Sequence, residues 1–282
     1  MKINRVGKIN QSVDCRATPL VSVIMPSFNS GQYIKKAIQS VLAQSFFDFE
    51  ILIIDGGSVD NTIEIIKYYA ERDGRVIYLN NVNDKGPAHA RSIGINRCSG
   101  KYVAFLDADD IWLPNKLLLQ TEFMRLNDVS FCYTSYRIMD KTENQVTCIV
   151  PMYKSYNFYQ ALSRRGIGTL TVMISRHLLD AKIIQNNEKF HGEEYLWWLL
   201  ILKQGNIARH LNEDTARYRQ TDNSLSSHRY KHQMTVWHSY RNEVGLGLFL
   251  SSAYYTSYLF DVTLRRIRVT FCGWISRRGG ND

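Results

Sequence analysis

Hydrophobic positions follow strand-like and helix-like patterns in turn over the first hundred residues. Four short apolar runs, rich in β-branched residues, are typical of strands buried on both faces. They lie at 20–26, 49–55, 75–79 and 101–107. The segments between them favour helices, at 34–42, 62–72 and 87–98. This alternation predicts an α/β fold, a mostly parallel sheet with helices on both faces.

The pattern is less regular after residue 130. Strands are expected at 131–139, 169–175 and 215–219, and a buried helix is expected at 193–205. A further helix is expected at 114–126, with Pro114 at its first position, where proline is well tolerated.

Length and composition are those of a globular protein. The 282 residues are 45% apolar, which is enough for one large α/β domain or two small ones. The five cysteines are scattered and lack the spacing of a zinc site or a disulfide framework, so a reducing cytoplasm fits best. The first residues contain no apolar run of the kind that a secretory signal needs, and we expect no export.

Polar loops follow three of the predicted strands. They contain Pro26 to Asn29, Asp55 to Ser58, and Asp107 to Asp110. Ligands of parallel α/β sheets bind beyond the carboxyl ends of the strands. We therefore expect these three loops to meet at one site.

The acidic run Asp107-Ala108-Asp109-Asp110 has the chemistry of a cation site. Alternation along a strand points Asp107 and Asp109 to one side, where two carboxylates would repel unless a divalent cation lies between them. Oxygen ligands favour Mg²⁺ or Mn²⁺, and such a metal can also bind a diphosphate. The alternative is an acidic turn in which Asp110 caps the following helix.

The loop Asp55-Gly56-Gly57-Ser58 is a tight turn with few side chains. Its backbone can approach a flat ring or a phosphate, and Asp55 can accept a hydrogen bond from a base N–H. Taken alone, a pair of glycines after a strand is more often an ordinary turn.

The order of these motifs resembles glycosyltransferase family 2. The blocks are PSFN, DGGSVDNT, KGPAHARSIGINRCSGKYVAFLDADD, GEEYLWW and YRQTDNSLS. The resemblance implies an inverting glycosyltransferase of GT-A fold, with a Rossmann-like sheet and a helical C-terminal extension. The expected organisation is an N-terminal extension at 1–18, a catalytic domain at 19–227, and a basic, apolar tail at 228–282.

The resemblance also implies roles for individual residues. The nucleotide pocket would be edged by Pro26, Phe28 and Asn29, and the DGGS loop with Asp55 and Gly57 would meet the base. Arg91 would lie close to the donor or its pyrophosphate, Asp107 would face the ribose or the metal, and Asp109 would be the main metal ligand, with Asp110 in support. Core packing for Phe28 and a solvated helix position for Arg91 are the alternatives. Arg219 is a further candidate for phosphate contact.

The catalytic base is expected in the pair Glu193-Glu194. The family usually has Glu-Asp there, and the aspartate takes the proton from the acceptor hydroxyl. Glu194 occupies that position, and its extra methylene leaves Glu193 as the other candidate. Acidic residues in a first helical turn are also favoured by the helix dipole alone.

Positive charge is concentrated in the tail. Residues 228–282 contain eight Lys and Arg and three Asp and Glu. The uncharged run 244–260 is too short to span a bilayer, but with 264–278 it could lie on an anionic membrane surface or pack on the catalytic domain. Its basic residues sit among apolar ones, which argues against a nucleic-acid interface.

These observations predict a transferase that moves a sugar from a nucleotide-sugar donor, UDP-linked by expectation, to a lipid-linked or glycan acceptor. The expected setting is bacterial surface polysaccharide synthesis, in the cytoplasm or on the inner face of the cell membrane. The alternative is a catalytically degenerate protein that binds nucleotide sugar without turnover. A dinucleotide site would need GxGxxG after the first strand, where this chain has PSFNSG.

Overall fold

The computed structural model describes residues 18–82, 86–141, 143, 146–150, 153–164, 166–180, 183–184, 193–220 and 229–278. The predicted N-terminal extension lies outside these residues, apart from Thr18. The strands are β1 (Val21–Ser27), β2 (Phe49–Asp55), β3 (Val76–Asn80), β4 (Tyr102–Phe105), β5 (Ile111–Trp112), β6 (Phe131–Met139), β7 (Val146–Ile149), β8 (Ser155–Tyr156), β9 (Met173–Ser175) and β10 (Ala208–Arg219). The α-helices are α1 (Ile34–Leu42), α2 (Thr62–Ala70), α3 (Pro87–Arg97), α4 (Lys116–Leu126), α5 (Phe158–Ser163), α7 (Glu193–Lys203), α8 (Arg229–His238) and α9 (Leu248–Arg278).

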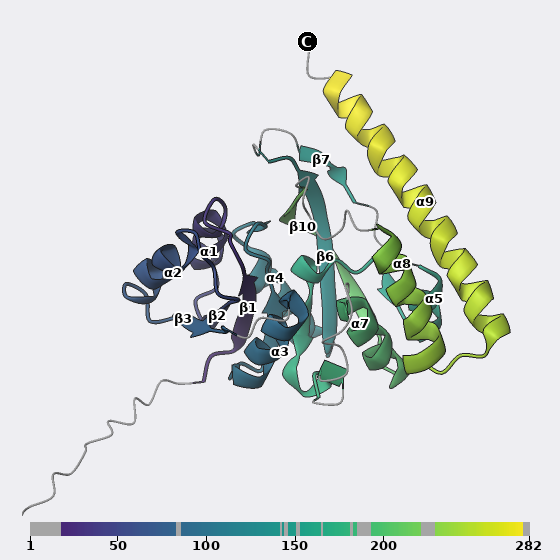
Figure 1. Ribbon diagram of the computed structural model, residues 1–282, viewed down its shortest axis with the longest axis horizontal. Coiled ribbons are helices and arrows are strands. Elements are labelled where there is room, and N and C mark those ends of the chain that lie inside the picture. Colours follow the sequence, from purple (N-terminus) through teal and green to yellow (C-terminus); the bar gives the residue numbers. More distant parts are fainter. Residues whose placement is uncertain are drawn as a thin grey trace, which may run out of the picture.

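One mixed sheet runs through the molecule in the order β3-β2-β1-β4-β9-β6-β10-β5 (Figure 1). The N-terminal strands β3, β2, β1 and β4 pair in parallel, as predicted from their apolar runs. β9 enters between β4 and β6 and is antiparallel to both. The register places Ser27 opposite Asp55, so the loops after β1 and β2 leave the same edge of the sheet side by side.

Helices cover both faces of the sheet, and each face has its own apolar core. On one side, alternate residues of β1 such as Val23 and Met25 pack with residues of α1, α2 and α4. On the other side, Ile24 and its neighbours pack with residues of α3, α5, α7 and α8 and with the first half of α9. Side chains alternate across a strand, so a continuous apolar run supplies both cores.

Several predicted elements have different bounds in the structure, and the strand expected at 215–219 begins earlier, at Ala208. The helix expected from Pro114 begins at Lys116. The strand expected at 169–175 is limited to β9, because a 3₁₀ turn occupies Thr169–Thr171. Side chains satisfy the carbonyls of this turn, since Trp112 Nε1 donates to Leu170 O at 2.8 Å and Gln120 Nε2 to Thr171 O at 2.9 Å. The turn therefore needs no strand partner there.

Candidate active site

The loops after β1 and β2 are hydrogen-bonded to each other. The Asn29 N–H donates to Ser58 Oγ at 2.8 Å, and Asn29 Oδ1 accepts from the Val59 N–H at 2.9 Å. Asn29 has a φ of +46°, a conformation that asparagine tolerates better than most residues. The two predicted nucleotide loops thus form one unit at the rim of the sheet.

Asp55 is completely buried and holds its own loop in shape. Its Oδ2 accepts hydrogen bonds from the Gly57 N–H at 3.0 Å and the Ser58 N–H at 2.8 Å, and its Oδ1 accepts from Ser58 Oγ at 2.6 Å. Gly57 has a φ of +85°, which disfavours any residue with a Cβ. The structure therefore assigns Asp55 a role in shaping the loop, and its predicted contact with a base stays a prediction.

Arg91 joins the two ends of the predicted site. This α3 residue is buried, which excludes the solvated position considered above. Its Nη2 lies 2.5 Å from Asp107 Oδ1, and its Nη1 forms an ion pair with Glu194 Oε1. Arg91 therefore connects the acidic loop after β4 to the first turn of α7, which lies far away in the sequence.

Burial and mutual repulsion perturb the acidic loop. Burial, followed by the charge of Asp107, raises the pKa of Asp109 to about 6. Asp110 is buried, and its pKa is raised well above the usual range by burial and then by the charges of Asp109 and Asp107. Its Oδ1 accepts a hydrogen bond from the Arg219 N–H at 2.8 Å, so Asp110 bonds to β10 instead of capping α4.

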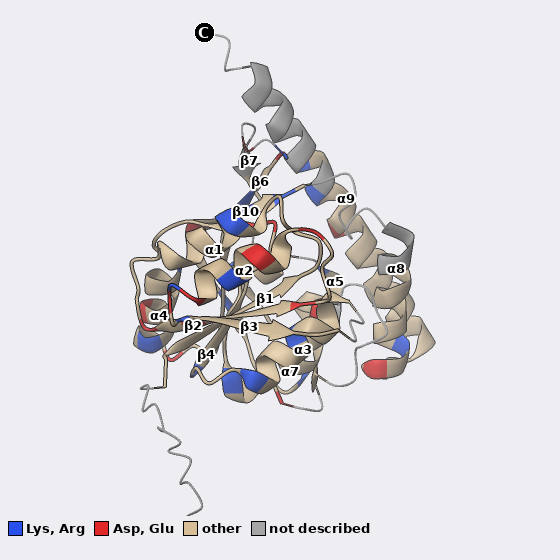
Figure 2. Ribbon diagram, turned by 60° about the vertical axis from the view of Figure 1, so that its left-hand side comes forward, with Lys and Arg blue, Asp and Glu red and all other residues tan. Residues whose placement is uncertain are grey.

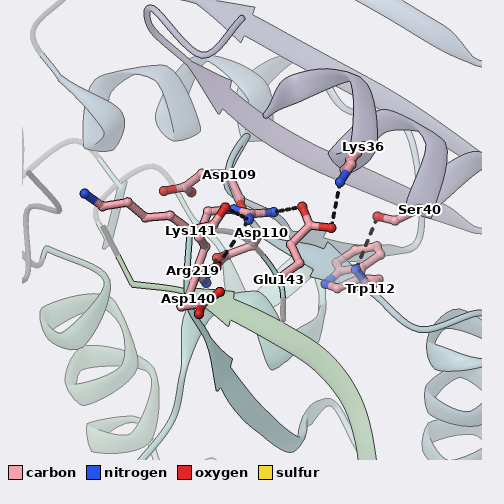
Figure 3. Close-up of polar contacts among 9 residues, drawn as sticks. All are labelled: Lys36, Ser40, Asp109, Asp110, Trp112, Asp140, Lys141, Glu143 and Arg219. Carbon is pink, nitrogen blue, oxygen red and sulfur yellow. Dashed lines mark hydrogen bonds and ion pairs between the residues drawn. The ribbon is translucent and has the colours of Figure 1, made fainter. Parts of the chain in front are cut away.

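Arg219 is hydrogen-bonded to the acidic loop (Figure 3). This last residue of β10 is 1% exposed, and its Nε donates to Asp109 O at 2.7 Å. Its Nη1 donates to Lys141 O at 3.2 Å, and its Nη2 pairs with Glu143 at 2.7 Å. Glu143 also pairs with Lys36 of α1 at 2.7 Å. The guanidinium thus bonds to protein groups on three sides, and the predicted phosphate contact of Arg219 stays a prediction.

The remaining predicted residues are placed at the same rim or outside the described side chains. Pro26 is buried in β1, whereas Phe28 is 56% exposed at the start of the loop and is no part of the core. Glu193 begins α7, and its side chain lies outside the described residues. The sequence did not predict the ion pair of Lys36 with Glu143. It joins a surface helix to a turn distant in the sequence, and no sequence motif marks such a contact.

The acidic loop has the chemistry of a site for a divalent cation. The effect of Asp107 on the pKa of Asp109 shows that these carboxylates are close enough to repel each other. Within the described residues, no group of three or more His, Cys, Asp and Glu side chains is arranged to hold a metal. Mg²⁺ and related ions commonly take only one or two protein carboxylates and complete their shell with substrate phosphates and water. The donor set therefore fits a metal that is shared with a diphosphate.

The mixed sheet with helices on both faces and the acidic run after β4 are those of a glycosyltransferase of the GT-A type. The profile of the family described as "Glycosyl transferase family 2" matches residues 22–184. The chain belongs to this family and is a glycosyltransferase, as its motif order predicted.

The alignments with two relatives extend over most of the chain. It is 36% identical over 251 residues to TuaG of Bacillus subtilis, assigned to teichuronic acid biosynthesis, with 88% of this chain and 98% of that protein aligned. It is 38% identical over 223 residues to WfgD of Escherichia coli, a UDP-Glc:α-D-GlcNAc-diphosphoundecaprenol β-1,3-glucosyltransferase. That alignment covers 77% of this chain and 84% of WfgD. Its relatives thus act in the synthesis of cell-surface polysaccharides.

Solved structures confirm the predicted fold. TarS 1–349 of S. aureus, in complex with UDP-GlcNAc, superposes with a TM-score of 0.62 at 17% identity, covering 85% of this chain and 71% of that one. The mannosyltransferase PcManGT of Pyrobaculum calidifontis, in complex with GDP-Man and Mn²⁺, also has a TM-score of 0.62, at 15% identity, with 84% and 70% covered. At these identities the likeness concerns the fold alone.

Proposed function

We propose that this glycosyltransferase inverts the anomeric centre of a sugar while moving it from a UDP-sugar to a lipid-linked or glycan acceptor in bacterial surface polysaccharide synthesis. The observation that supports this proposal is that Arg91 forms ion pairs with both Asp107 and Glu194, although these two residues are far apart in the sequence. An inverting transfer needs a carboxylate base on the face opposite the leaving diphosphate. The shared contact with Arg91 supports Glu194 as this carboxylate.

The donor would lie across the rim formed by the loops after β1, β2 and β4. Asn29, Phe28 and the DGGS loop with Asp55 would contact the nucleoside, and Pro26 would form the floor beside them. Asp109 and Asp107 would hold Mn²⁺ or Mg²⁺ together with the donor diphosphate. When bound, the metal neutralises the charge that develops on the leaving diphosphate. Mn²⁺ in the related fold of PcManGT supports this proposal.

The acceptor would approach from the side of α7. Glu194 takes the proton from the acceptor hydroxyl as that oxygen attacks the anomeric carbon, and the bond to the diphosphate breaks. Arg91 orients Glu194 for this step, while Glu193 is the second candidate base. The diphosphoundecaprenol acceptor of WfgD supports a lipid-linked acceptor here and hence a reaction at the inner face of the cell membrane.

The metal assignment is tested by Asp109→Ala. We expect this variant to lose Mn²⁺-stimulated release of UDP and to lose Mn²⁺ binding in a calorimetric titration in the presence of UDP. Asp73→Ala is a matched control, because Asp73 pairs with Arg75 just before β3, at the opposite end of the strands. Unchanged turnover in Asp109→Ala would refute the metal assignment.

The base is identified by comparing Glu194→Gln with Glu193→Gln. The variant that removes the base should lose about 10²- to 10⁴-fold in kcat while UDP affinity is retained. Tight UDP binding by the unmodified protein, with no turnover of any nucleotide sugar in a broad panel, would instead identify a binding protein without catalysis.

A further inference from the structure

The C-terminal helix α9 has one face packed on the molecule and another that is uncovered. In Figure 1 it lies at the outer edge, with α5 and α8 on its inner side. Ser251 and Tyr258 are buried, and Tyr255 and Val262 pack against the core beneath the helix. These contacts fix how the helix is rotated and thereby determine which residues face outward.

The outward face carries an apolar stripe, which we call the α9 stripe. It consists of exposed residues spaced three or four apart, which is the spacing of one helical face. They are Phe249, Ala253, Thr256, Phe260, Leu264 and Ile267. Phe249 is 85% exposed, Phe260 66% and Ile267 60%. Single exposed apolar residues are ordinary, but a continuous row of this length marks a binding surface.

The hydroxyl groups on and beside the stripe donate their hydrogen bonds to backbone carbonyls and do not need water as an acceptor. Thr256 Oγ1 donates to Ser252 O at 2.9 Å, and Thr263 Oγ1 donates to Leu259 O at 2.8 Å. Ser252 Oγ donates to Leu248 O at 2.9 Å. Each hydroxyl is satisfied by the carbonyl one turn earlier, which lowers the cost of moving this face into an apolar medium.

The stripe could contact a second copy of the chain or a lipid surface, and the charge of α9 favours the lipid surface. Within 248–278 the sequence contains five arginines and a single acidic residue, Asp261. Figure 2 shows basic positions on α9 close to its grey end. Arg268 is exposed, whereas Arg265 is half-buried and its side chain hydrogen-bonds to Tyr156 beneath the helix. A second copy of the chain would bring like charges together, whereas anionic lipid headgroups would neutralise them.

Among the helices of the described chain, none combines the length and apolarity needed for a bilayer span. The spacing of the stripe continues in the sequence at Phe271 and Trp274, and Trp is favoured at membrane interfaces.

We infer that the α9 stripe is a docking surface for anionic lipid bilayers, with its apolar side chains among the acyl chains and the exposed Arg268 at the headgroups. This inference rests on the proposed lipid-linked acceptor, because it explains how the soluble rim of the sheet is held near a substrate that stays in the membrane. The active site and the membrane contact would then be separate parts of one molecule.

Co-sedimentation with vesicles tests this inference on the full chain. The protein should bind vesicles of phosphatidylcholine with about 30% phosphatidylglycerol, and binding should weaken in 0.5 M NaCl and with phosphatidylcholine alone. The double variant Phe260→Glu, Ile267→Glu should bind at least about tenfold more weakly, since burial of each side chain contributes about that factor or more. Phe47→Glu is the matched control, because Phe47 is 72% exposed and lies in the loop before β2.

Three results would overturn the inference. They are no binding to anionic vesicles, equal binding by the double variant, or a dimer in analytical ultracentrifugation that the double variant abolishes. Donor hydrolysis measured without membranes separates this inference from the proposed function. The double variant should retain hydrolysis even where its vesicle binding is lost, whereas failure of the proposed function would remove hydrolysis from the unmodified chain.

Discussion

Replacing Arg219 with methionine is expected to lower the free energy of unfolding by about 3 kcal/mol and to loosen the acidic loop. Methionine fills similar apolar space but donates no hydrogen bond. Asp109 O then loses the Nε–H that lies 2.7 Å away, and a buried acceptor without a partner costs about 1–3 kcal/mol. Glu143 loses one of its two partners as well, at a smaller cost because Lys36 remains and water can reach the carboxylate.

The estimate lies at the lower end of the range for breaking a buried ion pair, about 3–5 kcal/mol, because only one partner is fully buried. Lys36→Met is the control, since it removes the exposed end of the same chain of contacts, and surface pairs contribute about 0–1 kcal/mol. Urea unfolding of the three proteins measures these differences. The backbone at Asp109 carries a proposed metal ligand, so Mn²⁺ affinity measured by calorimetry with UDP should fall about tenfold or more in Arg219→Met.

The reasoning would be refuted if Arg219→Met unfolds within 1 kcal/mol of the unmodified protein and binds Mn²⁺ with unchanged affinity. Arg219→Lys separates charge from geometry. A lysine keeps the charge but cannot reproduce the fork of donors, so it should recover only part of the stability.

Two other predictions concern the core. Burial lowers the pKa of Lys116 to about 7. Between that value and about 10.4 the unfolded chain binds the extra proton, so stability should rise with pH. The free energy of unfolding in urea should therefore differ between the unmodified protein and Lys116→Met by an amount that changes by about 1 kcal/mol per pH unit. Free energies that change in parallel with pH in the two proteins would contradict this. A Cβ on Gly94 would lie 2.6 Å from Ile24 Cγ2 and 2.9 Å from Ile54 Cδ1. Gly94→Ala should therefore cost about 1–3 kcal/mol in thermal unfolding, whereas Gly247→Ala, with open space around it, should cost little; equal melting temperatures would exclude the clash.

The periodicity of the chain was sufficient to predict the N-terminal half of the fold. Strands β1, β2 and β4 are buried on both faces, so their apolar runs are continuous and easily recognised, whereas the edge strand β3 is only partly buried. After residue 130 the signal is weaker. The start of β10, Ala208 to Asp214, is largely polar, and only TARYR at its end had a strand-like pattern. Its first residues are strand because β6 provides a hydrogen-bonding partner.

The candidate site likewise has one part that the sequence predicted and another that it did not. The acidic run and the glycine loop are local motifs, because their chemistry depends on residues adjacent in the sequence. The sequence alone therefore determined the family, the parallel sheet and the loops at its rim. Only the tertiary structure decided that Arg91 joins Asp107 to Glu194, that Arg219 bonds to the acidic loop, and which face of α9 is uncovered. Each of these depends on contacts between segments distant along the chain, and such contacts are set by packing and burial, which leave no regular spacing to read.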